Sequence, residues 1–339
     1  MSLIDVTRKF ATKDVCLDYL EQLRWPNGLC CIKCGVTGEG RIAKFTTNET
    51  TRERYSKTKG KVVTVKVPSR RLYECKDCGY QFSVTTGTVF HDSHLPLEKW
   101  MMAIGLMLEA KKGMSALQVA RHLGMSKKNY KSTWYLCHRI REAMIEAGLL
   151  LSGDVEADET FIGAQTRRRK RFARPITKPK DIVMGMIERG GRLKLMPIAD
   201  TKARIMQSVL EENISEHVGT IYTDEHPIYI FALKSKFPGK HKMIVHKRAF
   251  AVGLTHTNTI ESAFSLFKRG LRGSFHIVSK KHLPRYCDEF SYRFNRREKQ
   301  PQMFEETVKR LLDAKPLPFK ELTASGELSE PSIPASPGS

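Results

Sequence analysis

The chain has 339 residues, which exceeds one typical domain and favours two or three. Lys and Arg number 58 against 36 Asp and Glu, and the resulting net charge of +22 favours a nucleic acid or an anionic membrane surface as partner over a merely solvated basic surface. No run reaches the roughly 18 apolar residues of a membrane span. The N-terminal residues lack the apolar core of a secretion signal, so we expect a cytoplasmic, nucleoid-associated protein.

The first 95 residues contain a duplicated cysteine motif. We expect an N-terminal helix over residues 1–25 and a metal-binding module over residues 26–95. The pattern C-x-x-C-G occurs twice, and two such knuckles supply the four thiolates of a tetrahedral zinc site. A redox pair is the alternative, but it gives no reason for the duplication. The glycine that follows each knuckle favours Cys31 over Cys30, and the predicted ligands of a structural zinc are Cys31, Cys34, Cys75 and Cys78.

The segment between the knuckles is longer than a minimal zinc ribbon requires. Residues 46–60 are polar and charged and are expected to form an inserted loop, whereas residues 61–67 alternate like a strand. The module is too small to fold without its metal.

Residues 96–148 have a helical composition with a helix-turn-helix pattern. A first helix is expected from Ser115 to a C-cap glycine, Gly124, with Ser126 as the N-cap of a second helix over 127–144. An ordinary helical hairpin with a basic face is the alternative. If the segment binds DNA, its recognition helix begins with the contact residues Lys127, Lys128, Asn129 and Lys131.

Two acidic residues belong to short runs that are typical of strands. Asp158 lies in the run at 155–162, and Asp224 directly follows the β-branched and aromatic run at 220–223. Glu156 points to the same face of its strand as Asp158 and is the nearest alternative ligand.

Between these two acids the pattern predicts further elements. Strands at 181–188 and 192–198 complete an antiparallel meander, and an amphipathic helix follows at 201–216.

A third acidic residue, Glu261, opens a helix that ends near Gly270. Asn258 and Glu261 match a capping box, which is a complete structural explanation for the glutamate. However, Lys268 lies on the same side of the helix seven residues later, which capping does not predict. Three convergent carboxylates can hold two Mg²⁺ ions roughly 3.5–4 Å apart, the geometry of in-line displacement at a phosphodiester.

The C-terminal part is expected to be helical as far as residue 312. An aromatic stripe in residues 283–294 faces a core, and Arg293 and Arg296 near its end are predicted to contact the DNA backbone. Residues 313–339 become rich in Pro, Ser and Glu and are expected to form a disordered tail.

Taken together, these motifs resemble the DDE transposases of bacterial insertion sequences, in particular the ISXO-type group with an N-terminal zinc ribbon. The resemblance covers roughly residues 10–310. It rests on the two knuckles and on the runs at 156–163, 223–226, 256–270 and 282–297.

This resemblance implies an α/β multidomain protein: a zinc ribbon, the helix-turn-helix-like segment, and an RNase H-like catalytic core with a mixed sheet over residues 149–312. It also implies two catalytic Mg²⁺ or Mn²⁺ ions, held by Asp158, Asp224 and Glu261, and a phosphate anchor at Lys268. Some members of the group use Asn or His in place of the third acid, which keeps Asn258 as a candidate.

The implied activity is cleavage at transposon ends followed by DNA strand transfer. The implied partners are double-stranded DNA with terminal inverted repeats, target DNA and further copies of the chain. Two alternatives remain open: a DNA-binding regulator derived from a transposase, and a nuclease of the same fold that hydrolyses DNA without joining it.

Overall fold

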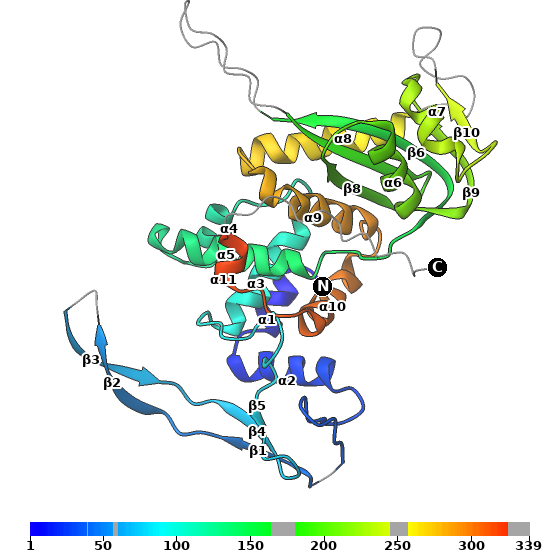
Figure 1. The fold of residues 1–339 in the computed structure, drawn as a ribbon. Coiled ribbons are helices and arrows are strands. Elements are labelled where there is room, and N and C mark those ends of the chain that lie inside the picture. The colour runs from blue at the N-terminus through cyan, green and yellow to red at the C-terminus, as the bar shows by residue number, and fades with distance from the viewer. Residues whose placement is uncertain (39, 57–59, 164–179, 245–256, 325–339) are drawn as a thin grey trace, which may run out of the picture.

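A computed structural model describes residues 1–38, 40–56, 60–163, 180–244 and 257–324. Figure 1 shows three regions: a small sheet with a long ribbon at one end, a cluster of helices in the middle and a five-stranded sheet at the other end. Within those described ranges, no helix is long and apolar enough to cross a membrane.

The helices in the middle share one hydrophobic core. It joins α1 (Leu3–Lys9), α2 (Lys13–Arg24), α3 (Leu97–Glu109) and α10 (Gln300–Asp313), although α10 follows the five-stranded sheet in sequence. The prediction of one helix over residues 1–25 is wrong, because the Thr12 side chain accepts a hydrogen bond from the Val15 amide and starts α2 as a separate helix.

Two further helices pack beside α3. The first, α4 (Ala116–His122), begins where the sequence predicted, with Ser115 as its N-cap. The second starts as a 3-10 turn, η1 (Lys127–Asn129), and becomes α-helical only in α5 (Tyr130–Glu142). The leading residues of the predicted second helix therefore lie in the turn rather than in the α-helix.

The small sheet consists of three short antiparallel strands. They are β1 (Ile42–Thr46), β4 (Arg71–Cys75) and β5 (Gln81–Phe82), in the order β1-β4-β5. Tyr73 and Phe82 are buried and stack on each other in its core.

A two-stranded ribbon extends the β1–β4 pair outward (Figure 1). It consists of β2 (Thr50–Ser56) and β3 (Lys61–Val67), paired antiparallel in register from Thr50 with Val67 to Ser56 with Lys61. The predicted loop over 46–60 is thus a strand for half of its length. The sequence did not reveal it because both of its faces are exposed and polar, which removes the alternation of a half-buried strand.

The large sheet is mixed and has the strand order β10-β9-β6-β7-β8. Strand β7 runs antiparallel to both neighbours, whereas β9 runs parallel to β6 and to β10. The strands are β6 (Leu151–Ile162), β7 (Asp181–Glu188), β8 (Leu193–Ile198), β9 (Ile214–Thr223) and β10 (His241–Met243).

Helices cover both faces of this sheet (Figure 1). One face packs against α6 (Ala203–Asn213) and α7 (Pro227–Lys234), and the other packs against α8 (Asn258–Gly270) and α9 (Leu283–Asn295). The helix predicted over 201–216 ends at Asn213, because the chain continues from Ile214 as the long strand β9.

Short elements complete the C-terminal part. A π-helical turn, η2 (Leu271–Phe275), extends α8, and η3 (Lys280–His282) precedes α9. The predicted tail begins later than residue 313, because α11 (Phe319–Thr323) is helical and its Leu322 side chain is buried. The rest of the predicted tail, residues 325–339, lies outside the described residues.

Candidate active site and zinc site

The pairing of β6 with β9 brings Asp158 next to Asp224. The two strands are parallel, and Glu156 lies opposite Tyr222. Asp158 and Asp224 each lie two residues further along their own strand direction. Neighbouring strands are about 4.8 Å apart, so this register sets the two acids side by side at the same edge of the sheet.

The carboxyl group of Asp158 lies in a half-buried, negatively charged environment. Burial and the nearby charges of Glu159, Asp224 and Glu261 raise its pKa to about 7, against a smaller opposing effect of the Glu159 amide, which donates to Asp158 Oδ1 at 2.8 Å. These three acids therefore lie within electrostatic reach of Asp158. Glu159 points to the opposite face of the sheet, where the Tyr229 hydroxyl group donates to it at 2.5 Å.

Asp224 is held by the turn that follows β9. Its Oδ1 accepts a hydrogen bond from the backbone amide of His226 at 3.0 Å, and His226 in turn caps the N-terminus of α7. The turn therefore fixes the direction of the Asp224 side chain at the end of the strand.

Glu261 is exposed in the first turn of α8. The predicted capping box is wrong: the N-cap is Thr257, and Asn258 is the first helical residue. The Thr257 hydroxyl group donates to Glu261 Oε1 at 3.2 Å, while the Glu261 amide donates to the Thr257 carbonyl oxygen at 3.1 Å. Asn258 is also exposed, beside Glu261 in the chain.

The N-terminus of α8 is capped instead by Glu156, a fully buried residue of β6. Its Oε2 accepts hydrogen bonds from the amides of Thr259 and Ile260 at 2.9 and 3.1 Å. Its Oε1 accepts from the Thr259 hydroxyl group at 2.9 Å and from Arg189 Nε at 3.0 Å. The residue considered as an alternative ligand to Asp158 thus ties the helix of Glu261 to the strand of Asp158.

Sequence reasoning missed this contact between Glu156 and α8. The available signal was that Glu156 and Asp158 share one face of their strand, which is the face that α8 covers.

Lys268 lies two turns after Glu261 on α8 and is partly buried. Burial lowers the pKa of its ammonium group, as do Arg272 and Lys180, while the negative charge of Asp158 acts in the opposite direction. The Lys268 side chain is therefore within electrostatic reach of the Asp158 carboxyl group.

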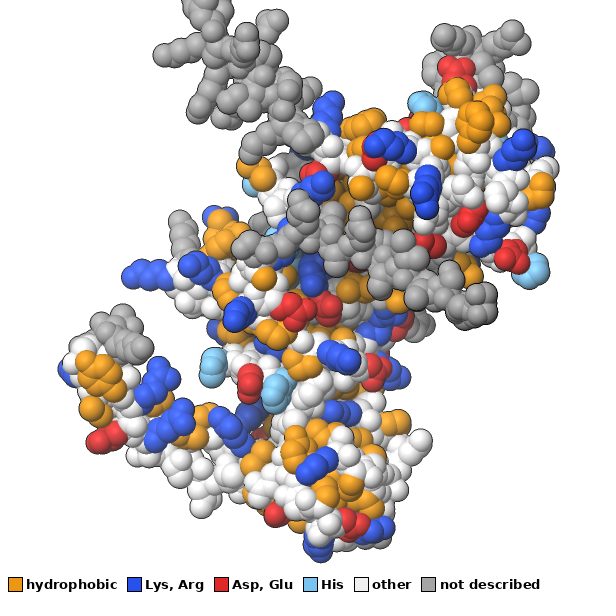
Figure 2. All heavy atoms as spheres, in the orientation of Figure 1, with side chains coloured by type: hydrophobic (Ala, Val, Ile, Leu, Met, Phe, Trp, Pro, Cys, Tyr) orange, Lys and Arg blue, Asp and Glu red, His pale blue; other side chains and the backbone are white. Residues whose placement is uncertain are grey.

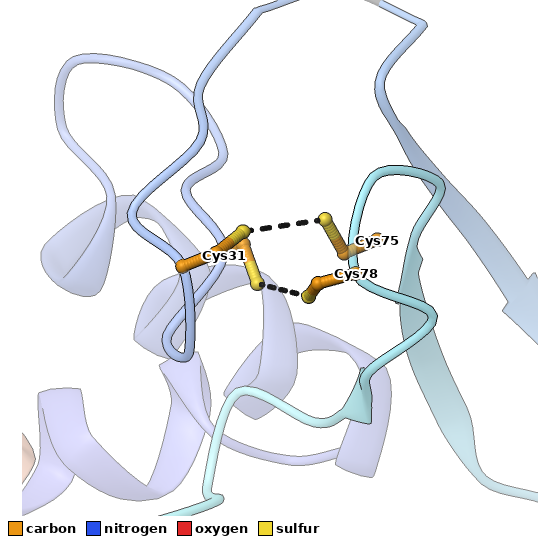
Figure 3. Close-up of side chains that lie close together, drawn as sticks. Cys31, Cys75 and Cys78 are labelled. Carbon is orange, nitrogen blue, oxygen red and sulfur yellow. Dashed lines mark hydrogen bonds between the residues drawn. The ribbon is translucent and has the colours of Figure 1, made fainter.

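These acids form a looser group than the cysteines. The Sγ atoms of the four predicted cysteines all lie within 4.8 Å of one another. Within the described residues, no other group of three or more potential metal ligands is as close. Cys31 Sγ lies 3.7 Å from Cys78 Sγ, and Cys34 Sγ lies 3.6 Å from Cys75 Sγ (Figure 3). Tetrahedral coordination with Zn–S bonds of 2.3 Å places sulfur atoms about 3.8 Å apart, so the cluster fits one structural zinc.

Both knuckles have the same backbone geometry. Gly35 and Gly79 adopt φ values of +74° and +65°, which favour glycine, and each donates its amide back to the carbonyl oxygen of the first cysteine of its knuckle. Cys30 stays outside the cluster, with its thiol near the Gly35 carbonyl oxygen at 3.5 Å.

Two regions of the chain, one with the cysteine cluster and one with the acidic residues, match known protein families. The transposase zinc-ribbon domain matches residues 11–81, and the ISXO2-like transposase domain matches residues 150–295, so that the two matches together span more than half of the chain. Residues 11–81 are therefore a transposase zinc ribbon, and residues 150–295 are an ISXO2-like transposase domain. An uncharacterized protein in the transposable element ISH50 of Halobacterium salinarum is 28% identical over 308 residues, which cover 84% of this chain and 92% of the relative. The family resemblance expected from the sequence is confirmed.

The basic residues predicted to contact DNA fall into two groups. Lys128, Asn129 and Lys131 are exposed around the start of α5, where a polyanion can reach them, while the side chain of Lys127 lies outside the described part of the structure. The second group, Arg293 and Arg296 of the C-terminal segment, is not exposed.

Arg293 is buried and forms an ion pair with Glu289, which also binds the buried Arg141 of α5 at 2.6 Å. Arg293 donates a further hydrogen bond to the Ala110 carbonyl oxygen. The structure therefore contradicts the predicted DNA contact of Arg293. Its guanidinium group instead joins α9 of the transposase domain to the helical region. Periodicity within α9 did not reveal it, because the Ala110 carbonyl oxygen and Arg141 come from distant segments, although Glu289 lies four residues earlier in α9.

Arg296 is partly buried and is also paired within the protein. Its guanidinium group binds Glu146 at 2.8 Å and Glu306 at 2.5 Å, and it lies over the ring of Tyr292. The DNA contact of Arg296 stays a prediction.

Proposed function

We propose that the chain is a DDE transposase, which cuts DNA at the ends of its element and joins the freed ends to target DNA. The observation that carries the proposal is the shared edge of β6 and β9, where Asp158 and Asp224 lie side by side and Glu261 is within electrostatic reach. In this proposal the mixed sheet, with helices on both faces, is an RNase H-like catalytic core.

The three acids fit a pair of divalent cations. Carboxylate oxygens are the ligands that Mg²⁺ and Mn²⁺ prefer, and the mutual repulsion around Asp158 is the kind that bound cations relieve. Asp158, Asp224 and Glu261 would hold these ions, and Asn258 is the alternative third ligand. When bound, they would supply activation of the attacking oxygen and stabilisation of the leaving oxygen in a phosphoryl transfer.

Other residues of the chain would position the reaction. Lys268 would hold a phosphate beside the cut, because its ammonium group is within electrostatic reach of Asp158 and lies on the same side of α8 as Glu261. Glu156 would keep Glu261 at a fixed distance from Asp158 through its hydrogen bonds to the first turn of α8. Precise placement of catalytic groups contributes to the rate alongside their charges.

Binding of the element ends is assigned to the N-terminal half. The helix-turn-helix-like pair α4–α5 presents Lys128, Asn129 and Lys131 to solvent, a pattern suited to phosphate and base contacts. The ligands of this half would be the terminal inverted repeats of the element. Joining two ends to one target brings both ends into one complex, so the proposal includes a homo-oligomer assembled on DNA.

One experiment separates this proposal from its two alternatives. The full zinc-loaded chain is incubated in Mg²⁺ with duplexes that carry the ends of the element and a supercoiled target plasmid. A transposase yields cut ends and joined products, and both disappear when a chelator removes Mg²⁺. A nuclease of the same fold would give cut ends without joining, and a DNA-binding regulator would give retarded complexes without any cut.

A further inference from the structure

The β2–β3 ribbon, residues 50–56 and 61–67, projects from the zinc ribbon away from the rest of the molecule (Figures 1 and 2). Every β2 residue from Thr50 to Tyr55 is exposed, and the ribbon contributes no residue to the hydrophobic clusters of the described chain. A two-stranded hairpin without a core is at best marginally stable in water. The projection therefore adds little to the stability of the fold, and its surface is available for binding.

The register of the ribbon sorts its side chains onto two unlike faces. Residues directly opposite each other in an antiparallel pair point to the same side, and successive residues alternate. One face, called the cationic face below, has three positive charges and no carboxylate. It consists of Thr50, Arg52, Arg54, Ser56, Lys61, Val63, Val65 and Val67. The opposite face carries Thr51, Glu53, Tyr55, Val62, Thr64 and Lys66.

The charges of the cationic face are not neutralised within the described chain. No Asp or Glu in the described residues lies within ion-pair distance of Arg52, Arg54 or Lys61, whereas Lys66 on the opposite face has Glu49 at 4.0 Å. The valines of the cationic face are only half-exposed, whereas Val62 on the opposite face is 57% exposed. This difference fits arginine stems that lie across the valines and direct their guanidinium groups outward.

We propose that the cationic face of the β2–β3 ribbon binds duplex DNA. The proposal rests on the proposed function, because it assumes that DNA is the substrate of the chain. The major groove, about 12 Å wide, admits a two-stranded ribbon. Seven residues per strand span about 23 Å, the length of roughly six or seven base pairs. The ribbon lies at the end of the molecule far from the catalytic sheet, so it would hold DNA at a distance from the cut (Figure 1).

The test compares the two faces by the salt dependence of DNA binding. The full zinc-loaded chain binds a fluorescent 30-base-pair duplex of mixed sequence, and the association constant is followed by anisotropy over a range of salt concentrations. The slope of log K against log salt is negative, and Arg52→Ala/Arg54→Ala should make it less steep by about 1.8. Binding at 0.1 M salt should be roughly tenfold weaker for each lost contact. Arg52→Lys/Arg54→Lys should keep most of that slope, because the charges remain.

The matched control is Lys66→Ala, which removes one cation from the opposite face of the same ribbon and should leave the slope unchanged within error. Its counterpart Arg54→Ala should make the slope less steep by about 0.9. Equal zinc content in all variants shows that the module is folded.

Three outcomes would overturn the proposal. Equal slopes for the wild type and the double alanine variant would show that the cationic face does not bind DNA, even if the chain still cuts DNA. The double alanine variant could instead differ from the wild type in oligomeric state without DNA, with the slope unchanged. That result would assign the ribbon to a contact between copies of the chain. Failure of the wild type to bind duplex DNA would overturn the ribbon and the proposed function together. Loss of cutting with normal DNA binding would concern the proposed function alone.

Discussion

The carboxylate of Glu156 on β6 accepts hydrogen bonds from both the backbone amide and the hydroxyl group of Thr259 in the first turn of α8. Asp158 lies two residues further along that strand, and Glu261 lies two residues further along that helix. The contact therefore joins the two elements that present these acids. A buried carboxylate at a helix N-terminus also matches the positive end of the helix dipole.

We predict that Glu156→Gln loosens the first turn of α8 without unfolding the chain. An amide group has only one acceptor oxygen and no charge, so the donors on one of the two carboxylate oxygens lose their acceptor and the donors on the other lose its negative charge, at a cost of about 1–3 kcal/mol. Hydrogen exchange of the Thr259 and Ile260 amides should become roughly 5- to 150-fold faster, measured by NMR or mass spectrometry. The exposed Glu225→Gln is the control and should leave both exchange rates unchanged. Wild-type protection of both amides in Glu156→Gln would show that the cap is dispensable.

We predict one tightly bound zinc per chain, lost in Cys75→Ser. The four thiolates form the whole coordination shell, and the small three-stranded sheet depends on the metal for its stability. Metal analysis of protein purified without chelator measures the zinc content. Cys30→Ser is the control, because the Cys30 thiol lies outside the cluster although it neighbours Cys31 in sequence. Zinc loss in Cys30→Ser with retention in Cys75→Ser would reverse the assignment.

We predict that Glu261→Gln folds and binds DNA but does not cut it. The Thr257 hydroxyl group can still donate to a glutamine side-chain oxygen, so the first turn of α8 is kept and the melting temperature should stay within about 2 °C of wild type. Only the charge needed for a divalent cation is lost. The matching variant is Asn258→Ala at the exposed neighbouring position, which should retain cutting. If Glu261→Gln cuts normally and Asn258→Ala does not, then Asn258 is the third ligand.

A site residue could be predicted from the sequence where its motif lies within a few neighbouring residues, and not where its partners lie far away in the chain. Cys31 and Cys75 were recognisable because each knuckle is a complete local motif with its own glycine. Asp158 and Asp224 were recognisable as acids within and directly after two strand-like runs, although their proximity depends on the parallel register of β6 and β9. The capping role of Glu156 was not predictable, because its partners lie about a hundred residues away.

The errors have the same physical origin. Arg293 was assigned to DNA because the α9 pattern does not show that the helical region covers this side of α9. There Arg293 donates to the Ala110 carbonyl oxygen, and its partner Glu289 also binds Arg141 of α5. The strand β2 was taken for a loop because neither of its faces is buried. Tertiary pairing supplies both features, and local composition does not encode them.

The most direct test of the proposed active site is the rate of DNA cutting in Mg²⁺ by two variants that each remove one charge at neighbouring positions. Asp224→Asn keeps an oxygen for the His226 amide and thus the turn, but loses the proposed ligand charge. Glu225→Gln removes an exposed charge that no proposed step uses. Under single-turnover conditions on element-end DNA, Asp224→Asn should be slower than wild type by about a thousandfold, because a lost ligand costs several kcal/mol of charge stabilisation, and Glu225→Gln should cut within about threefold of wild type. Cutting by Asp224→Asn within about tenfold of the wild-type rate would contradict the assignment of this edge of the sheet as the active site.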